Sequence, residues 1–283
     1  GNDALTAIVL YDYQPSRKGS CAQNFLDGFN GLVQCDGYQG YNRLEDVTLV
    51  CCLAHARRKF FEAVPAARRK KLKLLDINSD VAIEDSNLPD EEEAEQLIPA
   101  EIGLLYCNKL FYLERTLKDL DSGERKQQRT VLEQPIWEQF WNWLDTLHPT
   151  GGSKLGKAVN YAQNHHDTLM NYLLDGRCEI SNNRAERKAK SYAIGRKAFP
   201  FHTSEAGAGA SAVMYSIVET AKANNLNIFQ YLYTVLLYMP DYMNSSAGIE
   251  QLMPWSDFIK EKCSGLINVE SNVPENRIPL PLR

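Results

Sequence analysis

The sequence predicts an α/β protein that carries a large all-α part, and three observations support this fold class. First, the segments 5–13, 31–36 and 46–54 have the apolar, β-branched composition and the length of strands. Second, the apolar residues of 21–29 follow helical spacing between the first two of these strands. Third, the chain from 56 to 174 is helical in pattern almost throughout. A block of helices therefore interrupts an α/β sheet.

The predicted strands of the first part are bounded by turn-forming residues. The strand LTAIVLYDY (5–13) ends at the loop QPSRKGS, and the short strand GLVQCD (31–36) ends at Gly37. The segment DVTLVCCLA (46–54) has the composition of a buried strand. Strand, helix, strand and strand in this order indicate a sheet with at least one helix packed on it.

The central block is predicted to contain three long helices. They cover residues 94–120, 131–147 and 153–176, and Gly176 provides the stop signal of the third. The second helix carries an aromatic and aliphatic stripe, which is typical of a buried core face and not of a ligand platform. That stripe consists of Trp137, Phe140, Trp141 and Leu144.

The last part of the chain is also predicted to be mainly helical. Ser181, Asn182 and Asn183 are residue types that cap helix N-termini, so a helix is expected to begin there, with Glu186 about one turn in. Residues 192–204 are expected to form a loop or a short strand. Two further helices are predicted at 207–225 and 227–239, the second ended by Pro240. The tail from residue 244 has weak periodicity, and its proline-rich end is expected to be extended.

Composition excludes several classes of protein. The formal net charge is −5, but the charges are segregated, because an acidic run lies at 76–95 and basic clusters lie at 56–73 and 184–197. A mildly acidic total can therefore conceal a basic face that binds nucleic acid. Seven cysteines without a CxxC pair indicate neither a disulfide framework nor a zinc ribbon. No apolar run is long enough for a membrane span and no signal peptide is recognisable, so a cytoplasmic protein without membrane partners is expected.

Two positions in the first part are candidates for chemistry. Asp36 follows a predicted strand, where catalytic and metal-binding groups of open α/β sheets gather, although Asp-Gly is also the commonest hairpin turn. Cys52 and His55 have a C-x-x-H spacing, but two ligands do not make a zinc site. We expect Cys52 to be buried and His55 to be a hydrogen-bonding residue near the active centre.

Glu186 is one acid set among six basic residues of the segment 179–197, EISNNRAERKAKSYAIGRK. Taken alone, it is best explained as a surface charge, because acids are favoured near helix N-termini. The alternative is that this carboxylate has a functional role. Other segments of the chain are needed to distinguish the two explanations of Glu186.

Six segments occur in an order that resembles the transposases of the insertion sequence 66 family, which are bacterial DDE enzymes. The C-terminal stretches YLYTVLLYMP and LMPWSDF are also similar to the end of that family, so the resemblance covers most of the chain. The six segments are YDYQPSR (11–17), QCDGYQGYN (34–42), CLAHARRKFFEA (52–63), DGRCEISNNRAER (175–187), IGRK (194–197) and SIVETAKANNLN (216–227).

The resemblance implies an RNase H-like core interrupted by a helical insertion. In that pattern three acids hold two divalent metal ions, Mg²⁺ or Mn²⁺, the second acid matches Asp36 and the third matches Glu186. His55 falls where related families show a C-x-x-H signature, and Cys52 and Asn183 are expected to support the site. The implied division is 1–58 and 176–240 for the two parts of the core, 59–175 for the insertion and 241–283 for a C-terminal segment.

The resemblance also implies partners. DNA is expected as substrate, in the form of transposon ends and target, together with a second copy of the chain in a transposition complex and accessory proteins of the same element. The residues expected to hold DNA phosphates are Arg57, Arg58, Lys59, Arg184, Arg187, Lys188, Arg196 and Lys197.

One departure from the family pattern concerns its first catalytic aspartate, which lies on a strand before the YDYxPSR segment. Asp3 and Asp12 are the only acids before Gly19, and neither stands in that context. We therefore expect a truncated chain that lacks one acid and is inactive alone. A non-catalytic DNA-binding or regulatory remnant is one alternative function, and a helical protein-interaction module is another.

Overall fold

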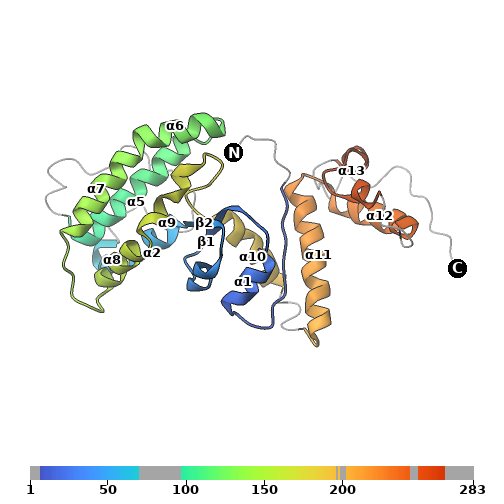
Figure 1. Cartoon of the computed structure of the whole chain (residues 1–283), viewed down its shortest axis with the longest axis horizontal. Helices are drawn as coiled ribbons and strands as arrows, with labels where there is room; N and C mark the ends of the chain where they lie inside the picture. The colour runs from blue at the N-terminus through green and yellow to red at the C-terminus, as the bar shows by residue number, and fades with distance from the viewer. Residues whose placement is uncertain (1–6, 70–96, 196, 198–201, 243–247, 265–283) are drawn as a thin grey trace. The chain divides into compact units, whose positions relative to one another are not determined.

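The computed structural model describes residues 7–69, 97–195, 197, 202–242 and 248–264 (Figure 1). These residues fall into two compact units. The first unit comprises 16–187, and the second combines 7–15 with the residues from 188 onward. Each unit is described here by itself. The four-part division expected from the sequence stays a prediction.

The first unit contains a two-stranded parallel sheet. Strand β1 (Gly31–Cys35) pairs with β2 (Val47–Cys51), with Gly31 opposite Val47 and Cys35 opposite Cys51. Helix α1 (Gly19–Phe25) precedes the sheet, and the 3₁₀ helix η1 (Gln39–Arg43) lies in the connection between the strands. The two strands expected at 31–36 and 46–54 are confirmed. The predicted fold class is confirmed in part: the described residues form a mostly helical protein with a small parallel sheet.

The strand predicted at 5–13 is wrong for residues 7–13, and residues 5 and 6 lie outside the described part. In the second unit this segment is extended but pairs with no described strand. Its backbone bonds to side chains of a helix instead, because Thr220 accepts from the Val9 N–H at 3.0 Å and Ser216 accepts from the Tyr11 N–H at 2.8 Å. The β-branched composition therefore identified an extended conformation without identifying its hydrogen-bond partner.

Helices make up the rest of the first unit (Figure 1). Helix α2 follows β2 directly, and α5 and α8 both pack against it. The helical elements in chain order are α2 (Leu53–Ala63), α3 (Ala66–Arg69), α5 (Pro99–Thr116), α6 (Ser122–Leu132), α7 (Gln134–Asp145), α8 (Lys154–Asn164), α9 (His166–Met170) and the 3₁₀ helix η3 (Asn171–Leu174).

Several helix boundaries of the central block differ from the predicted ones. The helix expected at 131–147 is divided between α6 and α7, because Pro135 has no backbone N–H and favours the first turn of a new helix. The helix expected at 153–176 is divided into α8, α9 and η3. The start of α6, capped by the Asp121 side chain on the Glu124 N–H at 2.9 Å, was not predicted.

The core of the first unit is aromatic, as the stripe on 131–147 predicted. Trp137 is fully buried and stacks on Trp141, with ring centroids 5.4 Å apart. Phe140 contacts Phe60 of α2 edge to face at 6.0 Å, so α7 and α2 share one core. Gly103 of α5 lies against the Phe60 ring, where an added methyl group would meet a ring carbon at 2.4 Å.

The second unit is helical as well. The predicted helices at 207–225 and 227–239 are confirmed with slightly different ends, whereas the loop expected at 192–204 begins only after α10, and its residues 196 and 198–201 lie outside the described part. The weakly periodic tail contains two short helical elements. Helix α10 (Asn183–Gly195) begins in the first unit and belongs to the second from Lys188 onward. The other elements of the second unit are α11 (Glu205–Ala223), α12 (Ile228–Tyr238), η4 (Met239–Tyr242), η5 (Ile249–Leu252) and α13 (Asp257–Cys263).

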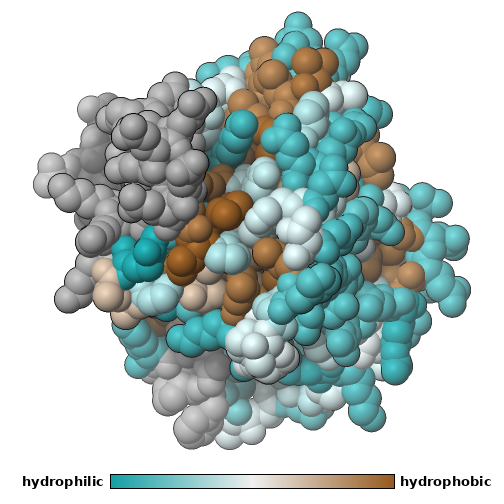
Figure 2. All heavy atoms as spheres, turned by 90° about the vertical axis from the view of Figure 1, so that its left-hand side faces the viewer, coloured by the Kyte–Doolittle hydropathy of each residue, from teal (hydrophilic) through white to brown (hydrophobic). Residues whose placement is uncertain are grey.

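The surface is mixed in polarity. On the face shown in Figure 2, hydrophilic residues surround smaller hydrophobic areas. Among the described helices, none combines the length and the apolar character that crossing a membrane requires. All seven cysteines lie in the described part and are free, so no disulfide contributes to the fold.

Candidate active site

The candidate site lies where both parallel strands end. Asp36 follows the last residue of β1, and Cys52 follows the last residue of β2 and precedes α2. The Cys52 N–H donates to the carbonyl of Cys35 at 3.1 Å, which extends the strand pairing by one bond. Because the strands are parallel, Asp36 and the first turn of α2 are at the same edge of the sheet.

Asp36 is exposed at the start of a turn. Its Oδ1 accepts a hydrogen bond from the Tyr38 N–H at 3.0 Å, and Gly37 has φ +80°. The Asp-Gly pair thus forms a turn, but not a hairpin, since β1 and β2 are parallel. The turn leaves the second carboxylate oxygen without a hydrogen-bond partner among the described residues.

Gly37 is required at this place for two reasons. A side chain would disfavour its left-handed backbone conformation, and a Cβ would meet the Tyr161 hydroxyl and the His165 ring, each at 2.9 Å. Tyr161 and His165 come from the end of α8 and the residue after it. The Lys59 ammonium lies 4.9 Å from the centre of the Tyr161 ring, so α8 lines the site beside α2.

Glu186 lies next to His55. The His55 Nε2 and the Glu186 Oε1 are 3.5 Å apart, with the His55 side chain 24% exposed and that of Glu186 42% exposed. Burial lowers the pKa of His55, and the nearby cations Arg58 and Lys59 lower it further, while Glu186 and Asp36 act in the opposite direction. A neutral His55 that donates from Nε2 to Glu186 fits this arrangement.

The segment before α10 brings Glu186 to this edge of the sheet. The carbonyl of Ile180 accepts from the Leu53 N–H, the first of α2, at 3.1 Å. The Cys52 thiol, fully buried, has a pKa raised by burial; hydrogen bonds from the backbone of Asn182 and of the first turn of α2 oppose that shift. The starts of α2 and α10 are therefore joined through the backbone.

The predicted start of α10 is confirmed at Asn183, with Glu186 in its first turn. The prediction that the Asn182 side chain caps this helix is wrong, because its buried Oδ1 has no hydrogen-bond partner among the described residues. The Asn182 carbonyl accepts from the Glu186 N–H at 3.0 Å, and Asn183 is half-buried. The buried Nδ1 of His55 is likewise without a partner in the described part.

The basic residues predicted to bind phosphate fall into different environments. Arg57 faces the helical block: its Nε donates to the Asn108 side chain of α5 at 2.6 Å, and burial lowers its pKa. Arg58 and Lys59 are half-buried beside His55. Arg184 and Arg187 are exposed on the first turns of α10. Arg57 is accordingly less suited to a DNA contact than the exposed Arg184.

The remaining predicted basic residues belong to the second unit. Lys188 forms an ion pair with the buried Glu219 of α11, with Nζ and Oε2 2.9 Å apart, and Lys222 bonds the other oxygen of that carboxylate at 2.7 Å. Lys197 is exposed, and Arg196 lies outside the described residues. Lys188 therefore has a partner within its own unit.

The donor set suits a hard divalent cation better than zinc. Asp36 and Glu186 offer accessible carboxylate oxygens, and His55 contributes its ring at the same edge. Among the described residues no group of three or more acidic, histidine or cysteine side chains is arranged to hold a metal ion. Two carboxylates alone predict weak binding of Mg²⁺ or Mn²⁺.

Sequence reasoning missed Tyr161 and His165 as neighbours of Asp36. They lie in the segment 153–176, for which the sequence predicted a helix and no role at a site. They are separated from Asp36 by more than a hundred residues, so no local pattern predicted the contact. The sequence did show two polar aromatic residues four apart on a predicted helix, which places them on one helix face.

Comparison with known proteins identifies the family of the chain. Residues 2–210 match the model of the transposase IS66 family, and residues 216–255 match that of the IS66 C-terminal element. The chain therefore belongs to the IS66 transposase family.

Curated relatives come from Sinorhizobium fredii (strain NBRC 101917 / NGR234). The proteins named uncharacterized protein y4hP and uncharacterized protein y4qI are each 28% identical to this chain, over 267 and 261 residues. These matches cover 90% and 88% of the chain but 44% and 43% of the relatives, so the chain spans less than half of their length. No solved structure matches the chain.

Proposed function

We propose that the chain contributes to the DNA-cleavage and strand-transfer site of a DDE transposase, with Asp36 and Glu186 as two of its metal-binding carboxylates. The observation that carries the proposal is the contact between Glu186 and His55 at the strand edge where Asp36 also lies. Family membership supports a transposase role. We further propose that β1, β2 and the start of α10 belong to an RNase H-like core.

The carboxylates would hold Mg²⁺ or Mn²⁺, which in two-metal sites activates the attacking oxygen and stabilises the leaving one. His55, which is half-buried, would keep the Glu186 carboxylate oriented by donating from Nε2. Arg58, Lys59 and Arg184 would hold backbone phosphates near the carboxylates without reading the base sequence. In this arrangement the surface-charge explanation of Glu186 is the weaker one, because Glu186 faces a partly buried histidine.

Mn²⁺ binding tests the carboxylate pair directly. Titration of the 283-residue chain, followed by the electron paramagnetic resonance signal of free Mn²⁺, should show weak binding to the wild type. Asp36→Asn and Glu186→Gln should each lower the affinity by about tenfold or more, since each removes a ligand or its charge. Glu62→Gln, at an exposed acid near the other end of α2, should bind Mn²⁺ like the wild type.

Two results of that titration would contradict the proposal. One is a wild-type chain that binds no Mn²⁺ at any tested concentration. The other is an equal decrease in Glu62→Gln and Glu186→Gln, which would mean that the measured binding is unspecific attraction to an acidic protein.

DNA binding tests the basic residues at the site. Arg58→Gln with Arg184→Gln should weaken binding to duplex DNA at low salt and reduce the slope of log affinity against log salt by about 1 to 2 units, because each neutralised phosphate contributes about 0.9 to that slope. Lys109→Gln with Lys126→Gln removes two exposed lysines from α5 and α6 and should leave the slope unchanged. Fluorescence anisotropy at several salt concentrations measures both.

Together with the Mn²⁺ titration, the DNA-binding measurement separates the alternative functions. Salt-sensitive DNA binding without any Mn²⁺ binding would favour a non-catalytic DNA-binding remnant. An oligomer that binds no DNA at physiological salt would favour a helical interaction module.

A further inference from the structure

Arg129 of α6 contacts the segment that leads to Glu186. It is fully buried, and its guanidinium donates to three backbone carbonyls of that segment and the 3₁₀ helix before it. The Nη1 bonds the carbonyls of Tyr172 and Asp175, each at 2.9 Å, and the Nη2 bonds the carbonyl of Cys178 at 2.7 Å. One side chain thus bonds three carbonyls, one in η3 and two in the segment that follows it.

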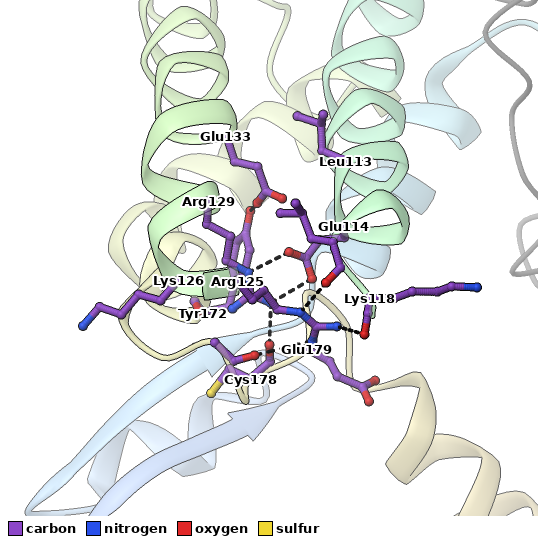
Figure 3. Close-up of polar contacts among 12 residues, drawn as sticks. Leu113, Glu114, Lys118, Arg125, Lys126, Arg129, Glu133, Tyr172, Cys178 and Glu179 are labelled. Atoms are coloured by element: carbon purple, nitrogen blue, oxygen red, sulfur yellow. Dashed lines mark hydrogen bonds and ion pairs between the residues drawn. The ribbon is translucent and has the colours of Figure 1, made fainter. Parts of the chain in front are cut away.

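The charge of Arg129 is balanced inside the helical block. The Glu114 carboxylate of α5 accepts from Nε at 2.6 Å and from Nη2 at 2.8 Å, a two-point contact that fixes the plane of the guanidinium. Figure 3 shows Arg129 extending from α6 between Glu114, Tyr172 and Cys178. Because the plane is fixed, the directions of the bonds to the carbonyls are fixed as well.

A second arginine one turn earlier contacts the same segment. Arg125 is buried and donates to the carbonyls of Lys118 at 2.9 Å and Gly176 at 3.4 Å. In Figure 3 it lies below Arg129, toward the turn that follows α5. The segment 175–178 is thereby attached to α6 at several points.

The other end of the segment is attached to the sheet. Gln34 of β1 donates to the carbonyl of Glu179, and the Leu53 N–H of α2 donates to that of Ile180. Residues 175–182 therefore connect α6 to the strand edge over a short distance in sequence, and Glu186 is one turn beyond. Because this segment is short and hydrogen-bonded at both ends, a displacement of α6 should also displace Glu186.

From these contacts we propose that Arg129 is a positioning residue for Glu186: through segment 175–182 it sets where the first turn of α10 lies relative to His55. The helical block then has a role at the candidate site without touching the reacting groups. The relevance to catalysis rests on the proposed function of Glu186, whereas the positioning itself does not.

The test replaces the ion pair as a whole. Glu114→Leu with Arg129→Met removes the hydrogen bonds to the carbonyls while replacing a buried ion pair by apolar residues, a change that proteins often tolerate. The readout is the ring ¹H and ¹⁵N chemical shifts of His55, measured near pH 7 in metal-free buffer and assigned with His55→Gln. Glu186→Gln gives the shift change that marks removal of the Glu186 carboxylate.

The double variant should move the His55 signals toward their position in Glu186→Gln, by about half of that change or more, and lower Mn²⁺ affinity by about tenfold. Glu101→Leu with Arg68→Met, which removes the more exposed ion pair between α3 and α5 at 2.7 Å, is the control and should leave the His55 signals at their wild-type position.

A folded double variant with wild-type His55 signals would overturn the proposal, and so would His55 signals that do not respond to Glu186→Gln. If the double variant does not fold, Arg129→Lys, which keeps the positive charge but not the fork, gives the same comparison. Absence of Mn²⁺ binding in the wild type would refute the proposed function but leave the His55 comparison valid.

Discussion

Glu114→Gln should destabilise the first unit by about 3 kcal/mol, the cost expected when one partner of a buried ion pair is removed. Its carboxylate is 9% exposed and accepts two hydrogen bonds from Arg129, whose side chain is fully buried. The amide has no charge to offer the guanidinium. Chemical denaturation followed by tryptophan fluorescence measures the change in the free energy of unfolding.

Glu133→Gln, at the acid nearest this pair, should cost about 1 kcal/mol or less near pH 7. Burial, and then the negative Glu114, raise the pKa of Glu133 to about 9, so its carboxyl is neutral and an amide of the same shape changes little. The Tyr172 hydroxyl donates to the Glu133 Oε2, and a Gln oxygen accepts the same bond. Two isosteric substitutions in one network should thus have very different effects.

Combining Glu114→Gln with Glu133→Gln should cost more than the sum of the single changes. In the Glu114 variant the repulsion from Glu114, which after burial is the second cause of the raised Glu133 pKa, is gone, so Glu133 ionises more readily beside Arg129 and replaces part of the missing attraction. The double variant removes that compensation, so a coupling of about 1 kcal/mol or more is expected. Additive costs would show that Glu133 does not compensate for the loss of Glu114, and equal costs for both single variants would indicate that Glu133 is ionised in the native protein.

The elements that the sequence predicted correctly are those whose signal is local. The two parallel strands are short apolar runs, and the buried stripe of α7, from Trp137 to Leu144, repeats at helical spacing. The first segment failed because its composition specifies an extended backbone, while its partners, Ser216 and Thr220, lie on a helix far along the chain. The boundary at Pro135 is a local signal, and taking it into account predicts two helices.

The candidate site was predicted in part. Asp36, His55 and Glu186 were found through strand ends, a helix start and resemblance to a family, and the structure brings His55 and Glu186 together at the strand edge that carries Asp36. The sequence did not show which of the three consecutive cations of α2 faces the core and which faces the site. In the structure Arg57 bonds Asn108 of α5, whereas Arg58 and Lys59 lie beside His55. The direction of a helical side chain depends on which face the core occupies.

The contacts of Arg129 had no counterpart in the sequence prediction. Helix α6 has the sequence SGERKQQRTVL, which is typical of a solvated helix, yet Arg125 and Arg129, four residues apart, are buried. Arginine is mostly exposed unless it is paired, and besides Glu114 the partners of Arg129 are backbone carbonyls more than forty residues away. Composition cannot reveal partners of this kind, because every residue has a carbonyl.

Gly176→Ala should destabilise the first unit by about 3 kcal/mol, at the upper end of what an added methyl group costs in a packed site. The new Cβ would lie 1.8 Å from the carbonyl oxygen of Ser122 and 2.7 Å from its carbonyl carbon. Both atoms are backbone at the start of α6, so no rotamer change relieves the clash. Segment 175–178 has to move away from α6, which weakens the bonds from Arg129 to Asp175 and Cys178.

A glycine without neighbours provides the comparison. Gly209 in α11 has nothing within 4 Å of an added Cβ, so Gly209→Ala should be neutral or stabilise by up to about 1 kcal/mol through helix propensity. Amide hydrogen exchange locates the effect: Gly176→Ala should increase exchange at residues 178–186, including the Glu186 N–H that bonds Asn182. If Gly176→Ala has the stability and the exchange rates of the wild type, the segment can move relative to α6 without displacing Glu186. That result would contradict the positioning role of Arg129.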